Sequence, residues 1–141
     1  MDRLKQIWRS TMALPTWVLI WMFMFLVPAN IACFWLTDTK IGYWATITNI
    51  LMFPTNILVL WLNAGLSRAL AVPHLFAWIP LGTYVAYRLI TGTDVGPIER
   101  VYGTALLIIN FISLVFDTVD SVKWWQGDRE IFGRPEARPF I

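Results

Sequence analysis

The chain has 141 residues, of which 57% are hydrophobic and 14% charged, and its mean hydropathy is +0.59. A typical soluble domain has about 45–50% apolar and about 25% charged residues, so this composition excludes an ordinary soluble domain. The net charge of +2 comes without a basic stripe interleaved with aromatic residues, so no nucleic-acid partner is predicted.

A short N-terminal segment, residues 1–12, precedes four apolar runs that carry almost no charge. Runs of about 20 such residues predict transmembrane helices, because within lipid a helix satisfies its own backbone groups. Short connections make successive helices antiparallel neighbours. The predicted fold class is therefore all-α: a polytopic membrane protein whose transmembrane domain, residues 13–121, is a four-helix bundle with up-down-up-down topology. The predicted spans are residues 13–36, 41–63, 71–91 and 98–121.

The basic residues are distributed unevenly between the two sides of such a bundle. Because positive residues stay cytoplasmic, the distribution predicts that both termini are cytoplasmic and that residues 122–141 form a basic interfacial tail. The N-terminal segment, the second loop and the tail together carry eight of the 11 basic residues: Arg3, Lys5, Arg9, Arg68, Lys123, Arg129, Arg134 and Arg138. The opposite side has Lys40, Arg88 and Arg100.

Prolines and the one cysteine fall inside the predicted spans. Pro28, Pro54 and Pro80 each remove a helical hydrogen bond, which predicts either ordinary curvature or a kink that lines a cavity. Cys33 is predicted to be a small buried hydrophobe. The alternative is a lipidated cysteine, since "NIAC" faintly resembles a lipoprotein signal, although Asn30 and the apolar residues after Cys33 depart from that pattern.

Polar residues recur within the second and fourth spans. Residues seven apart on a helix drift by only about 20°, so the asparagines of the second span share one face. Two such polar faces are expected to meet inside the bundle, either as dry packing between helices or as a hydrated path. The residues of this predicted polar seam are Asn49, Asn56, Asn63, Asn110 and Ser113.

A charged cluster is predicted where the seam reaches the cytoplasmic side. Its members are Arg68, His74, Asp117, Asp120 and Lys123. The two carboxylates lie near a helix C-terminus, where the helix dipole disfavours negative charge, so they require cationic partners. Three interpretations stay open: a structural ion-pair lock, a proton- or cation-binding site, and a metal site, which the spacing does not favour. On the opposite side, Arg88 is expected to pair with Asp94 or Glu99.

Motifs of known chemistry are absent from the sequence. It has no phosphate-binding loop, no H-E-x-x-H, no C-x-x-C and no G-x-S-x-G. We therefore predict no catalytic residue, no bound metal and no cofactor, and an enzyme is the less favoured class.

Two stretches are similar to recurring segments of an uncharacterised family of small four-span proteobacterial membrane proteins. They are "GLSRALAVPHLFAWIPL", residues 65–81, and "NFISLVFDTVDSVKWWQGDRE", residues 110–130. The resemblance implies a bacterial inner-membrane location and no particular activity. The matching positions are Gly65, Arg68, His74, Trp78 and Pro80 in the first stretch, and Asn110, Ser113, Asp117, Asp120, Gly127 and Arg129 in the second.

The predicted function is that of a small inner-membrane protein, an oligomeric channel or exchanger for a small ion or solute. In this hypothesis the seam lines the route and the charged cluster forms its cytoplasmic mouth. The first alternative is an accessory or assembly subunit of a larger membrane complex, and the second is a lipid-binding protein or membrane enzyme. The expected partners are the lipid bilayer and either further copies of the chain or a larger complex.

Overall fold

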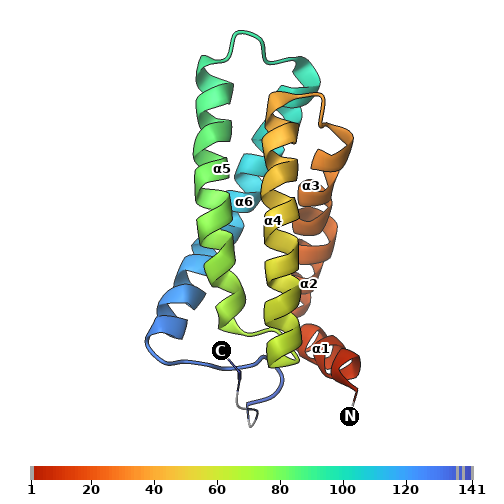
Figure 1. Cartoon of the computed structure of the whole chain (residues 1–141), viewed down its shortest axis with the longest axis vertical. Coiled ribbons are helices and arrows are strands. Elements are labelled where there is room, and N and C mark those ends of the chain that lie inside the picture. The colour runs from red at the N-terminus through yellow and green to blue at the C-terminus, as the bar shows by residue number, and fades with distance from the viewer. Residues whose placement is uncertain (1, 136, 138, 141) are drawn as a thin grey trace.

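The computed structural model describes residues 2–135, 137, 139 and 140. Four long helical segments pack into a bundle, and among the described residues one isolated antiparallel bridge pairs Ser67 with Ile131. Both termini lie at the same end of the bundle, which is called the termini end (Figure 1). The opposite end, with the loops at residues 36–39 and 92–96, is called the loop end.

The first apolar helix follows α1 (Arg3–Met12), which lies at an angle to the bundle at the termini end (Figure 1). It runs from Thr16 to Trp35 and changes its hydrogen-bonding pattern along its length. A proline has no N–H to give to the preceding turn, and π-bulges commonly accompany such an interruption. Accordingly, a π-helical turn lies beside Pro28. The parts are α2 (Thr16–Trp21), η1 (Met22–Leu26), α3 (Val27–Ile31) and the 3₁₀ turn η2 (Ala32–Trp35).

The second long helix, α4 (Lys40–Asn63), has a well-defined start and stop. The Thr39 hydroxyl accepts a hydrogen bond from the backbone N–H of Gly42 at 3.0 Å, as expected of an N-cap. The helix ends where Ala64 adopts a left-handed conformation, with φ of 48°. Gly42 is required where it stands, because a Cβ atom there would collide with the carbonyl group of Leu36.

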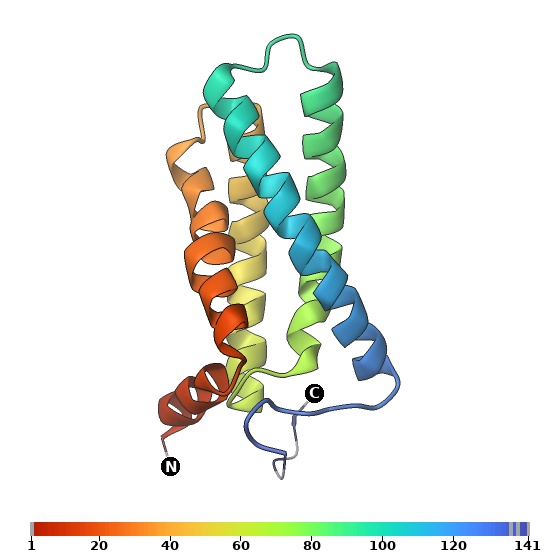
Figure 2. The same cartoon turned by 180° about the vertical axis from the view of Figure 1, so that it is seen from behind.

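The remaining long helices are α5 (Ala71–Thr91), which follows the short 3₁₀ turn η3 (Arg68–Leu70), and α6 (Pro97–Trp125). Pro97 is the first residue of α6, where a missing N–H costs nothing. Seen from behind, α6 crosses the bundle obliquely (Figure 2). The helix continues to Trp125 rather than ending at 121, so the tail predicted over 122–141 begins inside α6.

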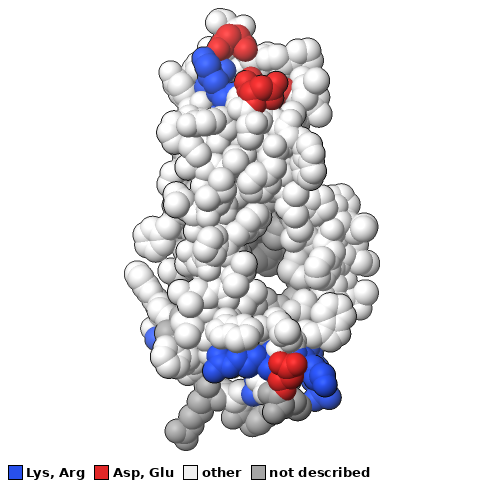
Figure 3. Space-filling model, turned by 45° about the vertical axis from the view of Figure 1, so that its right-hand side comes forward, with Lys and Arg blue, Asp and Glu red and all other residues white. Residues whose placement is uncertain are grey.

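The buried core occupies the bundle from the loop end to its middle. Cys33 is fully buried in it, as predicted, while the outer surface is apolar, with Phe76 78% and Ile90 82% exposed. By length and composition, four helical segments among the described residues could cross a membrane. On the face shown in Figure 3, charged residues gather at the two ends of the molecule. The core residues are Cys33, Ile41, Ala45, Met52, Trp78, Leu81, Val85, Tyr102 and Leu106.

The segment after α6 packs against the termini end. Ile131 is 1% exposed, and the N–H of Phe132 donates to the carbonyl of Leu66 at 2.9 Å. The buried Ser10 hydroxyl accepts from the N–H of Leu66 at 2.9 Å and donates to the carbonyl of Phe132 at 2.8 Å. This hydroxyl joins α1, the α4–η3 loop and the C-terminal segment into one packed layer.

Candidate functional site

The residues of the predicted seam bind several different partners. Two of the buried ones, Asn49 and Asn110, form an amide cluster with Asn30. The side-chain nitrogen of Asn30 donates to Oδ1 of Asn110 at 2.8 Å, and Asn49 donates to the backbone carbonyl of Asn30 at 2.8 Å. The three side chains are 2%, 0% and 4% exposed, respectively. Amides that bond one another in this way fill the space between α3, α4 and α6.

Asn30 was missed by the sequence analysis, although it is the residue that links this cluster. A 3₁₀ turn bonds to residue i−3 rather than i−4, so the change from α3 to η2 leaves the Asn30 carbonyl available to Asn49. The sequence does mark this residue, because Asn30 is an amide in an otherwise apolar span. The sequence analysis relates it only to the pattern of a lipoprotein signal, from which it departs.

The other seam residues lie in separate contacts. Nδ2 of Asn63 donates to the Ser67 hydroxyl at 2.8 Å, and its Oδ1 accepts from the N–H of Phe140 at 2.9 Å. Ser113 accepts from the indole N–H of Trp21 at 3.3 Å. Asn49, Asn56 and Asn63 share a face of α4, but each meets a different partner because different segments cover that face along its length.

A histidine site lies between α4, α5 and α6. Nδ2 of Asn56 lies 2.9 Å from Nε2 of His74, and Nδ1 of His74 lies 3.2 Å from Oδ2 of Asp117. With Asn56 donating to Nε2, the neutral imidazole carries its proton on Nδ1 and donates it to the carboxylate. The ring also stacks on Trp78, with centroids 4.4 Å apart and planes at 6°.

An arginine cluster lies on the tail side of the histidine site. Arg68 donates through Nε to Asp128 at 3.0 Å and through Nη2 to Glu130 at 3.2 Å, and its Nη1 binds Asp120. The Arg68 side chain is only 11% exposed. All three of its nitrogens are therefore engaged with carboxylates, and the arrangement ties η3 to α6 and to the segment after it.

The sequence placed Arg68, His74, Asp117 and Asp120 at one end and named Arg68, His74 and Lys123 as possible partners of the carboxylates. In the structure Arg68 binds Asp120, His74 binds Asp117, and Lys123 is exposed. Asp128 and Glu130 were missed as members, because their residues were interpreted only as part of a basic tail.

A pocket of about 380 Å³ opens beside both groups, between the first helix, η3 and α6. This volume is within the range of roughly 300–1,000 Å³ of small-molecule sites. Its walls are largely apolar and aromatic, and Arg68, His74, Asp117 and Asp120 supply the ionisable groups. The aromatic residues in the lining are Trp17, Trp21, Phe116 and Phe132.

Contacts across this pocket join α2 to α6. The rings of Trp17 and Phe116 have centroids 5.8 Å apart, and each side chain is about half exposed, at 58% and 49%. Deeper in, Trp21 and Ser113 make the hydrogen bond described above. The aromatic pair forms the outer rim of the pocket, and Asp117 and His74 lie in its lining.

A second ionic group, the loop-end network, consists of Lys40, Arg88, Asp94 and Glu99. Asp94 accepts from Arg88 at 2.8 Å and from Lys40 at 2.7 Å, and these bonds hold the pKa of the Asp94 carboxyl well below its ordinary value. The buried Glu99 carboxylate accepts from the backbone N–H of Ile41 at 2.9 Å and lies 4.0 Å from Arg88. Arg88 thus pairs with both predicted acids.

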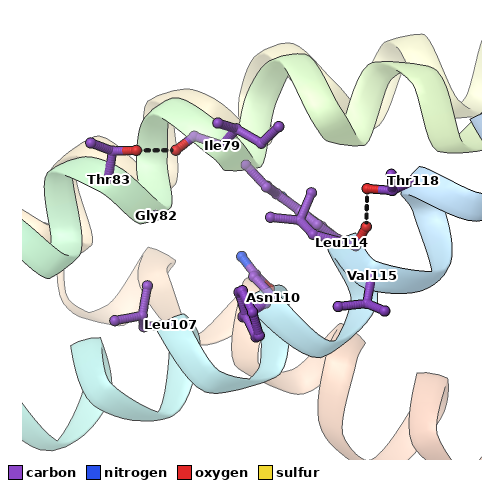
Figure 4. A pocket seen from close by; sticks show the side chains of 10 residues that line it. Ile79, Gly82, Thr83, Leu107, Asn110, Leu114, Val115 and Thr118 are labelled. Atoms are coloured by element: carbon purple, nitrogen blue, oxygen red, sulfur yellow. Dashed lines mark hydrogen bonds between the residues drawn. The ribbon is translucent and has the colours of Figure 1, made fainter.

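A groove of about 350 Å³ lies on the outer side of the α5–α6 contact. Figure 4 shows Gly82 and Thr83 on α5, with Asn110 and Leu114 on α6 at the opposite wall. Thr83 and Thr118 each return their hydroxyl to the backbone of their own helix, at 2.9 Å and 2.7 Å. Apart from Asn110 and Trp78, the groove therefore presents small and apolar groups.

Within the part of the chain that the structure describes, no three His, Cys, Asp or Glu side chains converge as metal ligands. Comparison of the chain with protein-family models, curated proteins and solved structures finds no match. The resemblance of residues 65–81 and 110–130 to small four-span membrane proteins thus stays a prediction.

Proposed function

We propose that the chain is a bacterial inner-membrane protein that crosses the bilayer four times, up-down-up-down, with both termini in the cytoplasm. The four long apolar helices, the exposed apolar surface and the charged ends support this placement. The orientation is supported by the basic residues of the termini end, since positive residues stay cytoplasmic. Of the residues that suggested it, Arg138 lies outside the described residues.

Within this placement we propose that the protein is an exchanger for a small solute, which it binds in the termini-end pocket. The observation that carries the proposal is the position of the His74–Asp117 pair in the lining of a largely apolar pocket. Ionisable residues at membrane depth are costly and are usually functional. An imidazole paired with a carboxylate can gain or lose a proton near neutral pH, which couples solute binding to proton movement.

The amide cluster favours an exchanger over an open channel through one chain. Asn30, Asn49 and Asn110 bond one another and fill the interior between the pocket and the loop end. A continuous water path would have to break these bonds. Transfer of a solute by this chain therefore requires the helices around the cluster to move, which is the behaviour of an alternating-access protein rather than a pore.

The Asn56 amide can serve His74 either as a hydrogen-bond donor or, after it turns, as an acceptor. Its Oδ1 is buried and has no hydrogen-bond partner among the described residues, while its Nδ2 donates to His74. When His74 gains a proton, both ring nitrogens become donors. A turn of the Asn56 amide then places Oδ1 as the acceptor for Nε2–H, while Nδ1–H keeps its bond to Asp117.

The experiment is to reconstitute the protein in liposomes and follow proton flux with an enclosed pH dye, with sodium, potassium or small organic ions as counter-substrates. Asp117→Asn should reduce flux strongly. The matched control is Asp38→Asn, the same chemical change in an exposed loop at the loop end, which should leave flux unchanged. No flux with any counter-substrate, or equal flux in the two variants, would contradict the proposal.

A second candidate function, an accessory subunit of a larger membrane complex, is favoured by the groove between α5 and α6. Small residues at membrane depth, here Gly82 and Thr83, let another helix approach closely. Purification in mild detergent separates the candidates. A stoichiometric foreign protein would favour the subunit, whereas only further copies of this chain would favour an oligomeric exchanger.

A further inference from the structure

We infer that the termini-end pocket takes an organic cation with an apolar body. This inference rests on the proposed exchanger and names the substrate class of the same site. It is drawn from the charges that the pocket leaves available and from the aromatic groups around them.

The first argument is that the guanidinium of Arg68 is already paired. Each of its three nitrogens already binds a carboxylate, from Asp120, Asp128 and Glu130. An anionic ligand would have to displace one of these carboxylates in order to reach the guanidinium. The other basic side chain among the described lining residues, His74, is bound to Asn56 and Asp117, so neither offers an anion a free partner. Neutralised in this way, Arg68 cannot be the group that selects the ligand.

The second argument is that the carboxylate of Asp117 is only partly paired. Among the described residues its carboxylate has one hydrogen bond, from Nδ1 of His74, and the carboxylate lines the pocket. One oxygen thus remains for a ligand. A cation that reaches it forms an ion pair in surroundings of low polarity, where a pair of opposite charges is strongly favoured over either charge alone.

The third argument is the aromatic lining. Trp17, Trp21 and Phe116 approach the pocket from α2 and α6. The faces of aromatic rings attract cations, most strongly where water is excluded, and Trp is the best of them. The same rings give the apolar body of the ligand a surface to pack against. An inorganic cation would leave this apolar surface unused.

Binding of the cation and release of a proton are linked at His74. His74 and the organic cation share the one negative charge of Asp117, each at a different oxygen. A cation bound there disfavours a second positive charge on the nearby imidazole, so the cation and a proton on His74 compete for the same carboxylate. The other charged groups that line the pocket are Asp120 and Arg68, which bind each other.

The test measures binding to the purified full chain by calorimetry, with two probes of the same shape and opposite charge. We expect tetraphenylphosphonium to bind and tetraphenylborate not to bind. Asp117→Asn should weaken tetraphenylphosphonium binding at least about tenfold, Asp117→Glu should restore most of it, and Asp38→Asn should leave it unchanged. In buffers of different ionisation enthalpy, binding should be accompanied by net release of protons, and this release should be lost in Asp117→Asn.

Equal affinity of the two probes, or equal affinity of the wild type and Asp117→Asn for tetraphenylphosphonium, would overturn the inference. The circular dichroism of each variant must match that of the wild type, and the Asp117→Glu variant keeps the test informative if Asp117→Asn does not fold. Proton-coupled flux of sodium without tetraphenylphosphonium binding would refute the substrate class and leave the exchanger intact. Tetraphenylphosphonium binding without proton-coupled flux would refute the exchanger alone.

Discussion

The two ends of the bundle use the same chemistry to different effect. Each has an arginine whose side chain is nearly buried, Arg68 at 11% and Arg88 at 12% exposed, and each arginine faces more than one carboxylate. At the loop end, Glu99 accepts from the backbone at the start of α4, and the pair of Lys40 with Asp94 lies in water, 62% and 52% exposed. At the termini end, the charged groups border a pocket of about 380 Å³.

The difference shows that space, rather than charge, distinguishes a structural ion pair from a candidate binding site. At the loop end the helices approach closely: a Cβ at Gly103 would come within 2.7 Å of the Ile41 side chain. At the termini end the pocket lies between α2 and α6, and the segment after α6 covers part of it with Phe132. A carboxylate at the loop end, that of Glu99, therefore caps a helix, whereas the carboxylate of Asp117 at the termini end remains available to a ligand.

The largest expected effect comes from removing each arginine in turn. Arg68→Met should lower the free energy of unfolding by about 1–3 kcal/mol, because it removes the cation shared by three partly exposed carboxylates. Arg88→Met should cost less, since Asp94 stays hydrated and the Glu99 carboxylate keeps its hydrogen bond from the N–H of Ile41. Unfolding in mixed micelles, followed by circular dichroism, measures both. Equal losses at the two ends would contradict the comparison.

The amide cluster separates the two ends, and breaking it tests whether the interior between them is dry. Asn30→Leu should cost about 2 kcal/mol, because it leaves the buried side-chain amide of Asn110 without its partner, whereas Asn49 keeps its bond to the backbone carbonyl at position 30. In a double-mutant cycle with Asn110→Leu, the double variant should be more stable than the sum of the single losses predicts, by about 1 kcal/mol. Additive losses would indicate that water already satisfies these groups.

Asp117→Asn tests whether the charged groups at the termini end serve exchange rather than stability. We expect exchange by this variant to fall about tenfold, equivalent to about 1.4 kcal/mol, with a smaller change in the free energy of unfolding. Asparagine keeps the shape of the side chain but has no negative charge to pair with a cation. Flux in liposomes and unfolding in micelles are measured on the same preparations, with Asp38→Asn as the control. A loss of stability as large as the loss of flux would support a structural lock instead.

The smallest effect is expected at Asp94, whose pKa Arg88 and Lys40 lower from its ordinary value of 3.8. A carboxyl with a lowered pKa in the folded state stabilises the fold above its unfolded pKa, and this contribution is lost as pH falls toward the folded value. Asp94→Asn should therefore lower Tm slightly at pH 7, and its difference from the wild type should shrink below about pH 4. A difference independent of pH would contradict this assignment.

The long helices and their faces follow from the sequence because composition and helical period are local properties. Long runs without charge specify helices that expose apolar surface, and four such segments are present. The residues that begin helices also act locally, as the N-cap Thr39 and the helix-initiating Pro97 do. The grouping of Arg68, His74, Asp117 and Asp120 at one end needed only helix lengths and short loops.

Which residues actually touch depended on packing that no local pattern contains. The period of α4 aligned Asn49, Asn56 and Asn63, but their neighbours are Asn30, His74 and Ser67, respectively, because three different segments cross that face. A break in the hydrogen-bonding of the first helix made the Asn30 carbonyl available. The chain beyond α6 turned back to bring Asp128 and Glu130 onto Arg68. Sequence thus determined the helices and the placement of charge, whereas tertiary packing decided which charges were enclosed and which were left beside a pocket.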